Sequence, residues 1–272
     1  YTTLNLVHGE ITPMRYGGNY KSYGPQYPRG IQEGNGVPAD GDLWVSYSVN
    51  KEDMWISRIP VPVEINASAH ADDDFSKNKS IAELTDWNIY SPVWAPVSLE
   101  DQWLKLQDKD PFDYAKVERK IPASKELKVS FDLKAGQNDK GTLQIEFLDE
   151  NGIVCSRMEL TDDGIFRLKG GSRFANMMKY EAGKVYHVEA VLSTVDRNIQ
   201  VYVDGKRVGL RMFYAPVAAV ERIVFRTGVP RTFPTVDTPA DQTYDLPNAG
   251  AQDPLAEYGI AKVKTSSTDK DA

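Results

Sequence analysis

Residues 185–206 read VYHVEAVLSTVDRNIQVYVDGK, and this stretch decides the fold class. Apolar and polar residues alternate in both of its halves, which is the period-two pattern of strands that bury one face. Val201 and Val203 therefore share a face, while Asp204 and Gly205 supply the positive φ angles that a tight type I′ turn needs. The stretch predicts a strand followed by a hairpin, at 185–193, 199–203 and 206–210.

The same alternation extends through the rest of the chain. Helical periodicity is almost absent, apart from a short piece near Ser80–Leu84. A second hairpin is predicted around Asn151-Gly152, because Asn-Gly favours a tight turn. Further strands are predicted at 87–97, 103–109, 115–121, 127–135, 142–148, 153–160, 165–168, 222–226 and 260–264. Short strands separated by turn signals about every 8–12 residues predict an all-β fold, an antiparallel jelly-roll β-sandwich.

A Tyr-His strand, Tyr186-His187, precedes the Val-Tyr-Val-Asp-Gly hairpin at 201–205. This arrangement resembles the laminin-G and concanavalin-like jelly rolls, and the likeness covers roughly residues 86–265. The resemblance implies a lectin-like sandwich that either binds glycans or braces a neighbouring catalytic domain. Fold alone does not choose between these roles.

The composition is that of a folded protein with neither nucleic acid nor a membrane as its partner. Hydrophobic residues make up 41% and charged residues 26% of the chain. The net charge of -7 argues against nucleic acid, because phosphate neutralisation needs clustered Lys and Arg. No apolar run approaches the roughly 20 residues of a membrane helix, so no membrane insertion is expected. The single cysteine, Cys155, lies in an apolar strand pattern and is predicted to be a buried structural thiol rather than a nucleophile.

The first part of the chain, residues 8–36, has a different chemistry and is rich in Tyr, Arg and Gly. Tyrosine rings stack on sugar faces, arginine forks read carboxylates, and glycine lets the backbone approach a ligand closely. The segment therefore predicts binding of a polysaccharide or oligosaccharide, with acidic sugars as the chemistry that fits best. The residues expected to bind this substrate are Arg15, Tyr20, Tyr23, Tyr27 and Glu33.

The stretch 41–62 predicts two strands, 42–49 and 54–59, joined by a turn at 50–53. This text is similar to the end of the β-propeller in secreted glycan-degrading proteins of Bacteroidetes. These are the sialidase-like (BNR-repeat) propellers, which include propeller polysaccharide lyases. The resemblance implies that residues 1–63 are the last, incomplete portion of a β-propeller, although the chain contains no Asp-box.

The propeller resemblance implies a parent protein that is a glycoside hydrolase or a polysaccharide lyase. A lyase needs a Tyr or His to take the proton next to a uronate carboxyl, and a cation to neutralise that carboxylate. Tyr16, Arg29 and His8 are the candidates for catalytic roles. Packing of the tyrosines between blades and pairing of the arginines with Glu10 or Glu33 is an equally good explanation.

The chain begins at Tyr1 rather than Met, which suggests a processed protein or a fragment. The remainder of a propeller is then expected upstream, packed against residues 1–63, and the localisation is expected to be secreted, periplasmic or outer-surface. The chain would by itself be catalytically incomplete. The alternative is a stand-alone, non-catalytic carbohydrate-binding protein.

Residues 64–85 are small, acidic and polar, and they are interpreted as a linker between the propeller portion and the sandwich at 86–265. A disordered tail is expected at 266–272. The run Asp72-Asp73-Asp74 has the oxygen ligands that calcium prefers, but such runs are more often simply solvated. No metal or other cofactor is therefore predicted.

Several residues of the sandwich have structural explanations beside functional ones. Trp87, Trp94 and Trp103 are candidates for a sugar platform, although burial between the sheets is more common for such residues. His187 is interpreted as an inward strand residue with a satisfied hydrogen bond. The carboxylates of one hairpin are interpreted as solvated rather than catalytic: Glu146, Asp149, Glu150 and Glu159.

Overall fold

The computed structural model describes residues 25–31, 42–60, 69–91, 94–110, 114–228 and 253–267. These residues fall into two units, the first containing 25–60 and the second containing 69–228 and 253–267. Within the described residues the only helix is the 3-10 turn η1, Ile81–Glu83. No helix in this part of the chain is long and apolar enough to cross a membrane.

The first unit is a three-stranded antiparallel sheet in the order β1-β2-β3, which span Pro25–Ile31, Asp42–Val49 and Asp53–Pro60. The predicted hairpin is confirmed, because β2 pairs with β3 across a turn in which Asn50 and Lys51 adopt φ values of 56° and 58°. One face of the sheet buries a small apolar cluster, in which the rings of Tyr47 and Trp55 stack with 6.3 Å between centroids.

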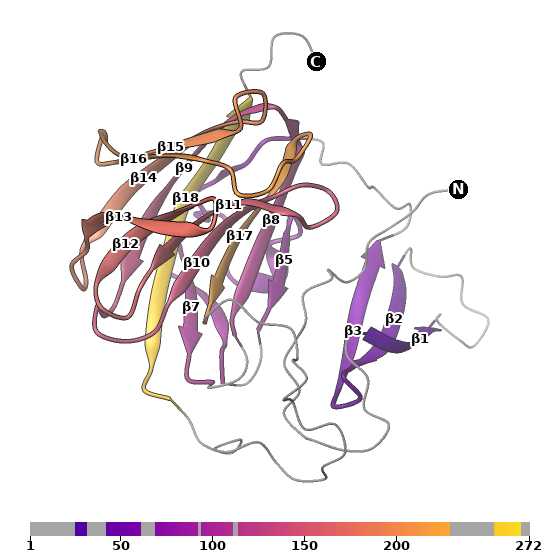
Figure 1. Ribbon diagram of the computed structural model, residues 1–272. Helices are drawn as coiled ribbons and strands as arrows, with labels where there is room; N and C mark the ends of the chain where they lie inside the picture. Colours follow the sequence, from indigo (N-terminus) through magenta and orange to yellow (C-terminus); the bar gives the residue numbers. More distant parts are fainter. Residues whose placement is uncertain are drawn as a thin grey trace, which may run out of the picture. The chain divides into compact units, whose positions relative to one another are not determined.

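The second unit is a sandwich of two antiparallel sheets (Figure 1). The first sheet has seven strands in the order β13-β12-β11-β10-β17-β8-β5, which span Arg173–Lys179, Ile165–Gly170, Val154–Leu160, Leu143–Leu148, Val220–Thr227, Lys116–Ser124 and Trp87–Tyr90. The second has the order β16-β15-β14-β9-β18-β7-β6, which span Lys206–Met212, Asn198–Val203, Val185–Ser193, Glu126–Ala135, Ala256–Ser267, Trp103–Asp108 and Val97–Glu100. Its eighth strand, β4 at Asp72–Asp73, pairs with β18.

The apolar core lies between the two sheets and is built by alternate residues of their strands. Phe131 of β9 and Phe225 of β17 meet across the sandwich in an edge-on contact, with 5.0 Å between ring centroids. Trp87 packs on Phe225 from the edge strand β5. Each fully buried side chain of this size stabilises the fold by about 1.5–3 kcal/mol. The predicted all-β fold, an antiparallel β-sandwich, is confirmed.

The predicted hairpin turns agree with the structure more closely than the predicted strands do. Asp204 and Gly205 adopt φ values of 50° and 77°, as the Asp-Gly turn requires. The stretch predicted as one strand over 87–97 instead contributes β5 and β6 to different sheets. Strand β13 was not expected, because its Ala, Asn and Met residues give little β-branched signal.

The segment 69–85 belongs to the sandwich unit in the structure, whereas the sequence places it in a linker. Strand β4 pairs with β18, and the side chains of Phe75 and Leu84 are buried in the sandwich core. At the other end of the chain, β18 extends to Ser267, so the first two residues of the expected tail at 266–272 are paired strand residues. The remaining tail residues lie outside the described part.

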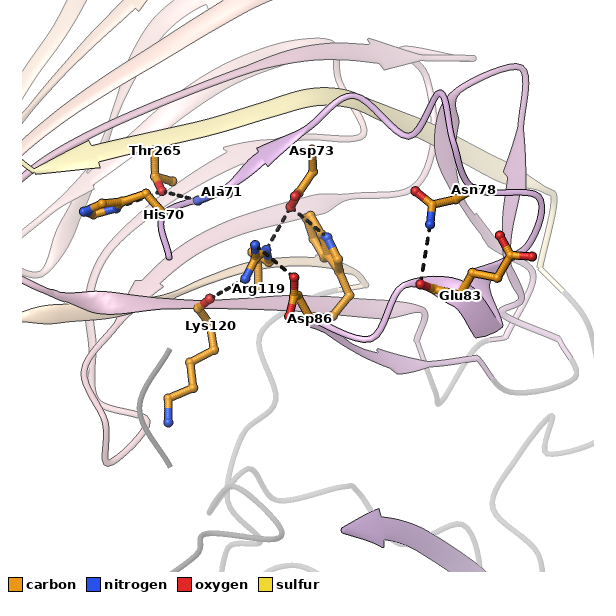
Figure 2. Close-up of polar contacts among 10 residues, drawn as sticks. His70, Ala71, Asp73, Asn78, Glu83, Asp86, Arg119, Lys120 and Thr265 are labelled. Atoms are coloured by element: carbon orange, nitrogen blue, oxygen red, sulfur yellow. Dashed lines mark hydrogen bonds and ion pairs between the residues drawn. The ribbon is translucent and has the colours of Figure 1, made fainter. Parts of the chain in front are cut away.

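A partly buried ion pair fastens this segment to the sheet (Figure 2). Asp73 Oδ2 accepts hydrogen bonds from Arg119 Nε at 2.8 Å and from Trp87 Nε1 at 3.0 Å. Arg119 also donates to the carbonyl oxygen of Lys120 at 2.8 Å. The carboxylate needs these donors because it is removed from most of the surrounding water. The anchor explains why a polar segment is ordered on the sandwich.

The two acidic neighbours of Asp73 also have partners. Asp72 pairs with Lys264 at 2.8 Å, and Asp74 accepts hydrogen bonds from the backbone and hydroxyl of Ser76. These hydrogen bonds lower the pKa of Asp74. Across the described ranges, no three His, Cys, Asp or Glu side chains gather in a way that would hold a metal ion.

Removing the guanidinium of the anchor should destabilise the sandwich. We expect Arg119→Met to lower the free energy of unfolding by about 2–3 kcal/mol, because it leaves a largely buried carboxylate without its cation. Urea denaturation measures this. The control is Lys264→Met, which breaks the exposed ion pair to Asp72 on the neighbouring residue of β4 and should change nothing measurable. Equal effects of both variants would contradict the anchoring role.

Candidate functional site

The outer face of the seven-stranded sheet carries rows of charged and polar side chains. Residues directly opposite each other in antiparallel strands project to the same face, so the register itself defines these rows. One row crosses six strands through Lys116, Arg226, Gln144, Glu159, Arg167 and Asn176. Beside it lies a second row, through Glu118, Val224, Glu146 and Arg157.

The pair Lys169 and Phe174 of β12 and β13 lies on this face too, because Lys169 alternates with Arg167 along β12. Arg222 alternates with Arg226 along β17 in the same way. The residues between them face the core. We call this outward set the polar face; it comprises Lys116, Glu118, Gln144, Glu146, Arg157, Glu159, Arg167, Lys169, Phe174, Arg222 and Arg226.

Much of the polar face is buried. Glu146 and Glu159 are only 1% and 2% exposed, and Gln144 is fully buried. The interpretation of the hairpin carboxylates as solvated was therefore wrong for both glutamates. Asp149 is also largely buried and accepts hydrogen bonds from two backbone N–H groups of its turn, whereas Glu150 is exposed as expected. Long side chains of adjacent strands cover the glutamates, which the sequence does not reveal.

Two guanidinium groups hold Glu146. Its Oε1 accepts from Arg157 Nε at 2.6 Å and Nη2 at 2.5 Å, and Arg226 Nη2 approaches to 3.4 Å. Its Oε2 is buried and has no hydrogen-bond partner among the described residues. Such charge-assisted, forked contacts fix both the position and the orientation of the arginines.

Glu159 is held in the same manner one row away. Gln144 Nε2 donates to its Oε2 at 2.6 Å, and Arg167 Nη2 donates to its Oε1. At the β8 end, Arg222 Nη1 donates to Glu118 Oε1 at 2.9 Å. Each carboxylate of the polar face thus faces at least one guanidinium. This arrangement suits recognition by charge and hydrogen bonding rather than proton transfer.

Aromatic rings border the polar face. Arg167 lies over Phe174 with 4.3 Å between its guanidinium carbon and the ring centroid, and Lys169 Nζ is 4.6 Å from the centroid of Tyr214. Tyr214 is fixed by its backbone N–H, which donates to the carbonyl of Cys155 at 3.0 Å, and burial raises the pKa of its phenol. Aromatic rings beside charged and hydroxyl-binding groups are common in sugar-binding sites, because the rings offer apolar surfaces on which sugars stack.

Cations outnumber anions on the polar face, although the whole chain has a net charge of -7. Three carboxylates face six cationic side chains, which are Lys116, Arg157, Arg167, Lys169, Arg222 and Arg226. The face is therefore positively charged within an acidic protein, and it favours a ligand with negative charge.

The structure places only two of the sequence-predicted site residues. Tyr27 and Arg29 lie on β1 of the first unit, and both are exposed. Tyr27 has a φ of 54° at the register shift between Gln26 and Arg29, and Lys51 Nζ lies 5.8 Å from its ring centroid. The other candidates lie outside the described residues: His8, Arg15, Tyr16, Tyr20, Tyr23 and Glu33.

The remaining single residues have structural roles. Trp87 is buried in the core, while Trp94 and Trp103 are half-buried. His187 makes the expected hydrogen bond, with its Nδ1 2.8 Å from Asp132 Oδ1, but it projects outward and is exposed, so the inward orientation was wrong. Cys155 is completely buried as predicted, and burial raises the pKa of its thiol to about 12.

The second unit is an antiparallel β-sandwich, and one face of its seven-stranded sheet presents arginine side chains beside aromatic rings. The family described as "Sialidase-like, CBM domain" matches residues 87–242, and the chain belongs to this family of carbohydrate-binding modules. A solved sialidase is 90% identical to the chain over 99% of its length, with a TM-score of 0.90. The chain spans 25% of the length of that sialidase.

More distant solved structures share the fold alone. One is an endo-acting O-glycanase expressed by members of the human gut microbiota to initiate mucin breakdown; it is 12% identical, with a TM-score of 0.52, over 72% of this chain and 98% of that one. Another is the Crh5 transglycosylase, also 12% identical with a TM-score of 0.52, over 75% of this chain and 86% of that one. No curated protein sequence matches the chain.

Sequence reasoning missed the polar face, although a signal was present. Strand β10 reads LQIEFL, so Gln144 and Glu146 alternate with apolar residues, and in β17, which reads VERIVFRT, Arg222 and Arg226 share one face of a largely apolar strand. In an edge strand, such a pattern indicates that the polar side chains face solvent. In central strands of a sheet it indicates a charged row that is shared with both neighbours.

The buried carboxylate of Glu146 should be essential for the stability of the polar face. We expect Glu146→Gln to lower the free energy of unfolding by about 3 kcal/mol, because Arg157 and Arg226 lose their shared anion. Urea denaturation measures the change. Glu100→Gln is the control, since Glu100 pairs with Lys105 in an exposed position and should have no measurable effect. A Glu146 variant as stable as the control would show that the carboxylate is not needed to hold Arg157 and Arg226.

The thiol of Cys155 should report unfolding. Because burial raises its pKa to about 12, almost no thiolate forms between pH 7 and 9, and reagent is also excluded. We expect no reaction with a disulfide-type thiol reagent in the native state at pH 8, and rapid reaction in urea. Fast labelling of the native protein would show that β11 is not packed as described.

Proposed function

We propose that the chain is the carbohydrate-binding part of a larger, secreted glycan-degrading protein, and that the polar face is where glycan binds. The observation that carries this proposal is the pairing of fixed arginine forks with aromatic rings on one sheet face. Forks hydrogen-bond sugar oxygens, and rings stack on the apolar faces of pyranoses. The ordered ion pairs hold these groups in place before ligand arrives, which limits the entropy cost of binding.

The charge of the polar face supports an acidic glycan as the ligand. Arginine binds carboxylates and other flat anions with two parallel hydrogen bonds, and Arg167 remains 35% exposed at its side chain. Sialate, uronate and sulfated sugars all carry a suitable group. A neutral glycan would leave the excess of cations uncompensated.

The first unit supports the proposal that the chain is part of a larger protein. On the face opposite its small core, Trp44, Met54 and Ile56 are 39%, 77% and 63% exposed. A three-stranded sheet with apolar residues on both faces is one strand short of a propeller blade and suits packing against further sheets. We propose that it ends a β-propeller of the parent, a glycoside hydrolase or polysaccharide lyase of the kind that Bacteroidetes secrete.

Within that propeller, Tyr16, Arg29 and His8 are proposed for catalysis. Arg15, Tyr20, Tyr23, Tyr27 and Glu33 are proposed for substrate binding. The chain covers a quarter of the sialidase that it resembles, which is consistent with further domains in the parent. A stand-alone binding protein is not favoured, because the similarity is to part of a longer glycan-active protein.

Calorimetric titration tests glycan binding by the polar face. We expect the chain to bind sialyllactose or trigalacturonate with a dissociation constant below about 1 mM. Phe174→Ala should weaken binding by about tenfold, because it removes a stacking surface. The control is Tyr202→Ala, which removes a ring from the other sheet and should leave affinity unchanged. Absence of binding to any glycan, or equal losses in both variants, would refute the proposal.

A further inference from the structure

Lys169 occupies an unusual position on the polar face. Its Nζ lies 4.6 Å from the ring centroid of Tyr214 and 5.7 Å from that of Phe174. Among the described residues, its ammonium makes neither an ion pair nor a hydrogen bond to an acceptor. The side chain is nevertheless only partly exposed. Within the part of the chain that the structure describes, Lys169 is thus a cation that contacts two rings and pairs with no anion.

The nearby carboxylates do not supply that anion. Glu146 is committed to Arg157 and Arg226, and Glu159 to Arg167 and Gln144. Burial, followed by the positive charge of Arg157, lowers the pKa of Lys169, and the more distant Glu159 and Glu146 oppose this only in part. The ammonium is therefore held where its charge is disfavoured.

Lys184 shows what a lysine over a ring looks like when its charge is satisfied. Its Nζ lies 5.0 Å from the ring centroid of Tyr186, a geometry close to that of Lys169 over Tyr214. Lys184 also pairs with Glu181 at 3.1 Å, and this hydrogen bond raises its pKa. The two lysines differ in their partners: a carboxylate pairs with Lys184, whereas none of the described carboxylates pairs with Lys169.

We propose that Lys169 is the subsite for the anionic group of the bound glycan, a carboxylate or a sulfate ester. The assignment rests on glycan binding by the polar face and adds where the charge of the ligand sits, namely at the β12–β13 end. The anionic oxygens accept hydrogen bonds from Lys169 Nζ and from the exposed part of Arg167. Tyr214 and Phe174 flank the group and exclude water, which strengthens these contacts.

Substitutions that separate charge from bulk test this subsite by calorimetric titration. Lys169→Met keeps the length of the side chain and removes its charge, while Lys169→Arg keeps a cation. The ligands are trigalacturonate with its neutral methyl ester, and sulfated lactose with plain lactose. We expect Lys169→Met to weaken binding of the charged member of at least one pair by about tenfold or more, because a charge-assisted hydrogen bond is lost.

The neutral member of that pair should bind Lys169→Met and wild type equally, and Lys169→Arg should retain most of the affinity for the charged one. The charged member that responds identifies the group as carboxylate or sulfate. Lys184→Met is the matched control and should bind as wild type does. As an independent readout, NMR of the lysine Cε carbons should show the pKa of Lys169 rising when the charged ligand binds.

Three results would overturn the assignment in distinguishable ways. If Lys169→Met binds charged glycans as tightly as wild type, the anionic group sits elsewhere while glycan binding stands. Equal loss of charged and neutral ligands would make Lys169 a general packing residue. Failure of the wild-type chain to bind any of the four ligands or sialyllactose would overturn the subsite together with the proposed function.

Discussion

The antiparallel register of the seven-stranded sheet is the constraint on which the site depends. Side chains alternate between the two faces, so one register places Ile145 and Phe225 in the core and Glu146 and Arg226 on the polar face. A slip of one residue would exchange these sets and bury several unpaired charges between the sheets, at a cost of several kcal/mol each. The charged residues of the polar face therefore disfavour other registers, and the native register in turn places them together on that face.

The same ion pairs link stability to function. A buried salt bridge is weak evidence of net stabilisation, because desolvation offsets much of the attraction. The pairs around Glu146 and Glu159 fix the orientation of the arginines, and Arg167, whose side chain is 35% exposed, is the one of them that solvent reaches most. Binding to such a surface requires little rearrangement of the protein.

The sequence predicted the fold better than the site. Asp204-Gly205 and the alternation around it were sufficient for the hairpin, because a turn and a period of two are local properties. The burial of Glu146 and Glu159 was not accessible in this way, since it depends on which strands become neighbours and on the side chains that those neighbours bring. The ion pair of Asp73 could not be predicted from the sequence for the same reason, because its partner Arg119 is 46 residues away. Lys169 and Tyr214 meet only in the folded sheet.

We propose that glycan binds on the outer face of the seven-stranded sheet. Chemical-shift mapping by NMR during titration with an acidic oligosaccharide tests it most directly. We expect the largest changes at Arg157, Arg167, Lys169, Phe174 and their immediate neighbours. Changes concentrated around His187 and Tyr202 on the other sheet, with the polar face undisturbed, would contradict it.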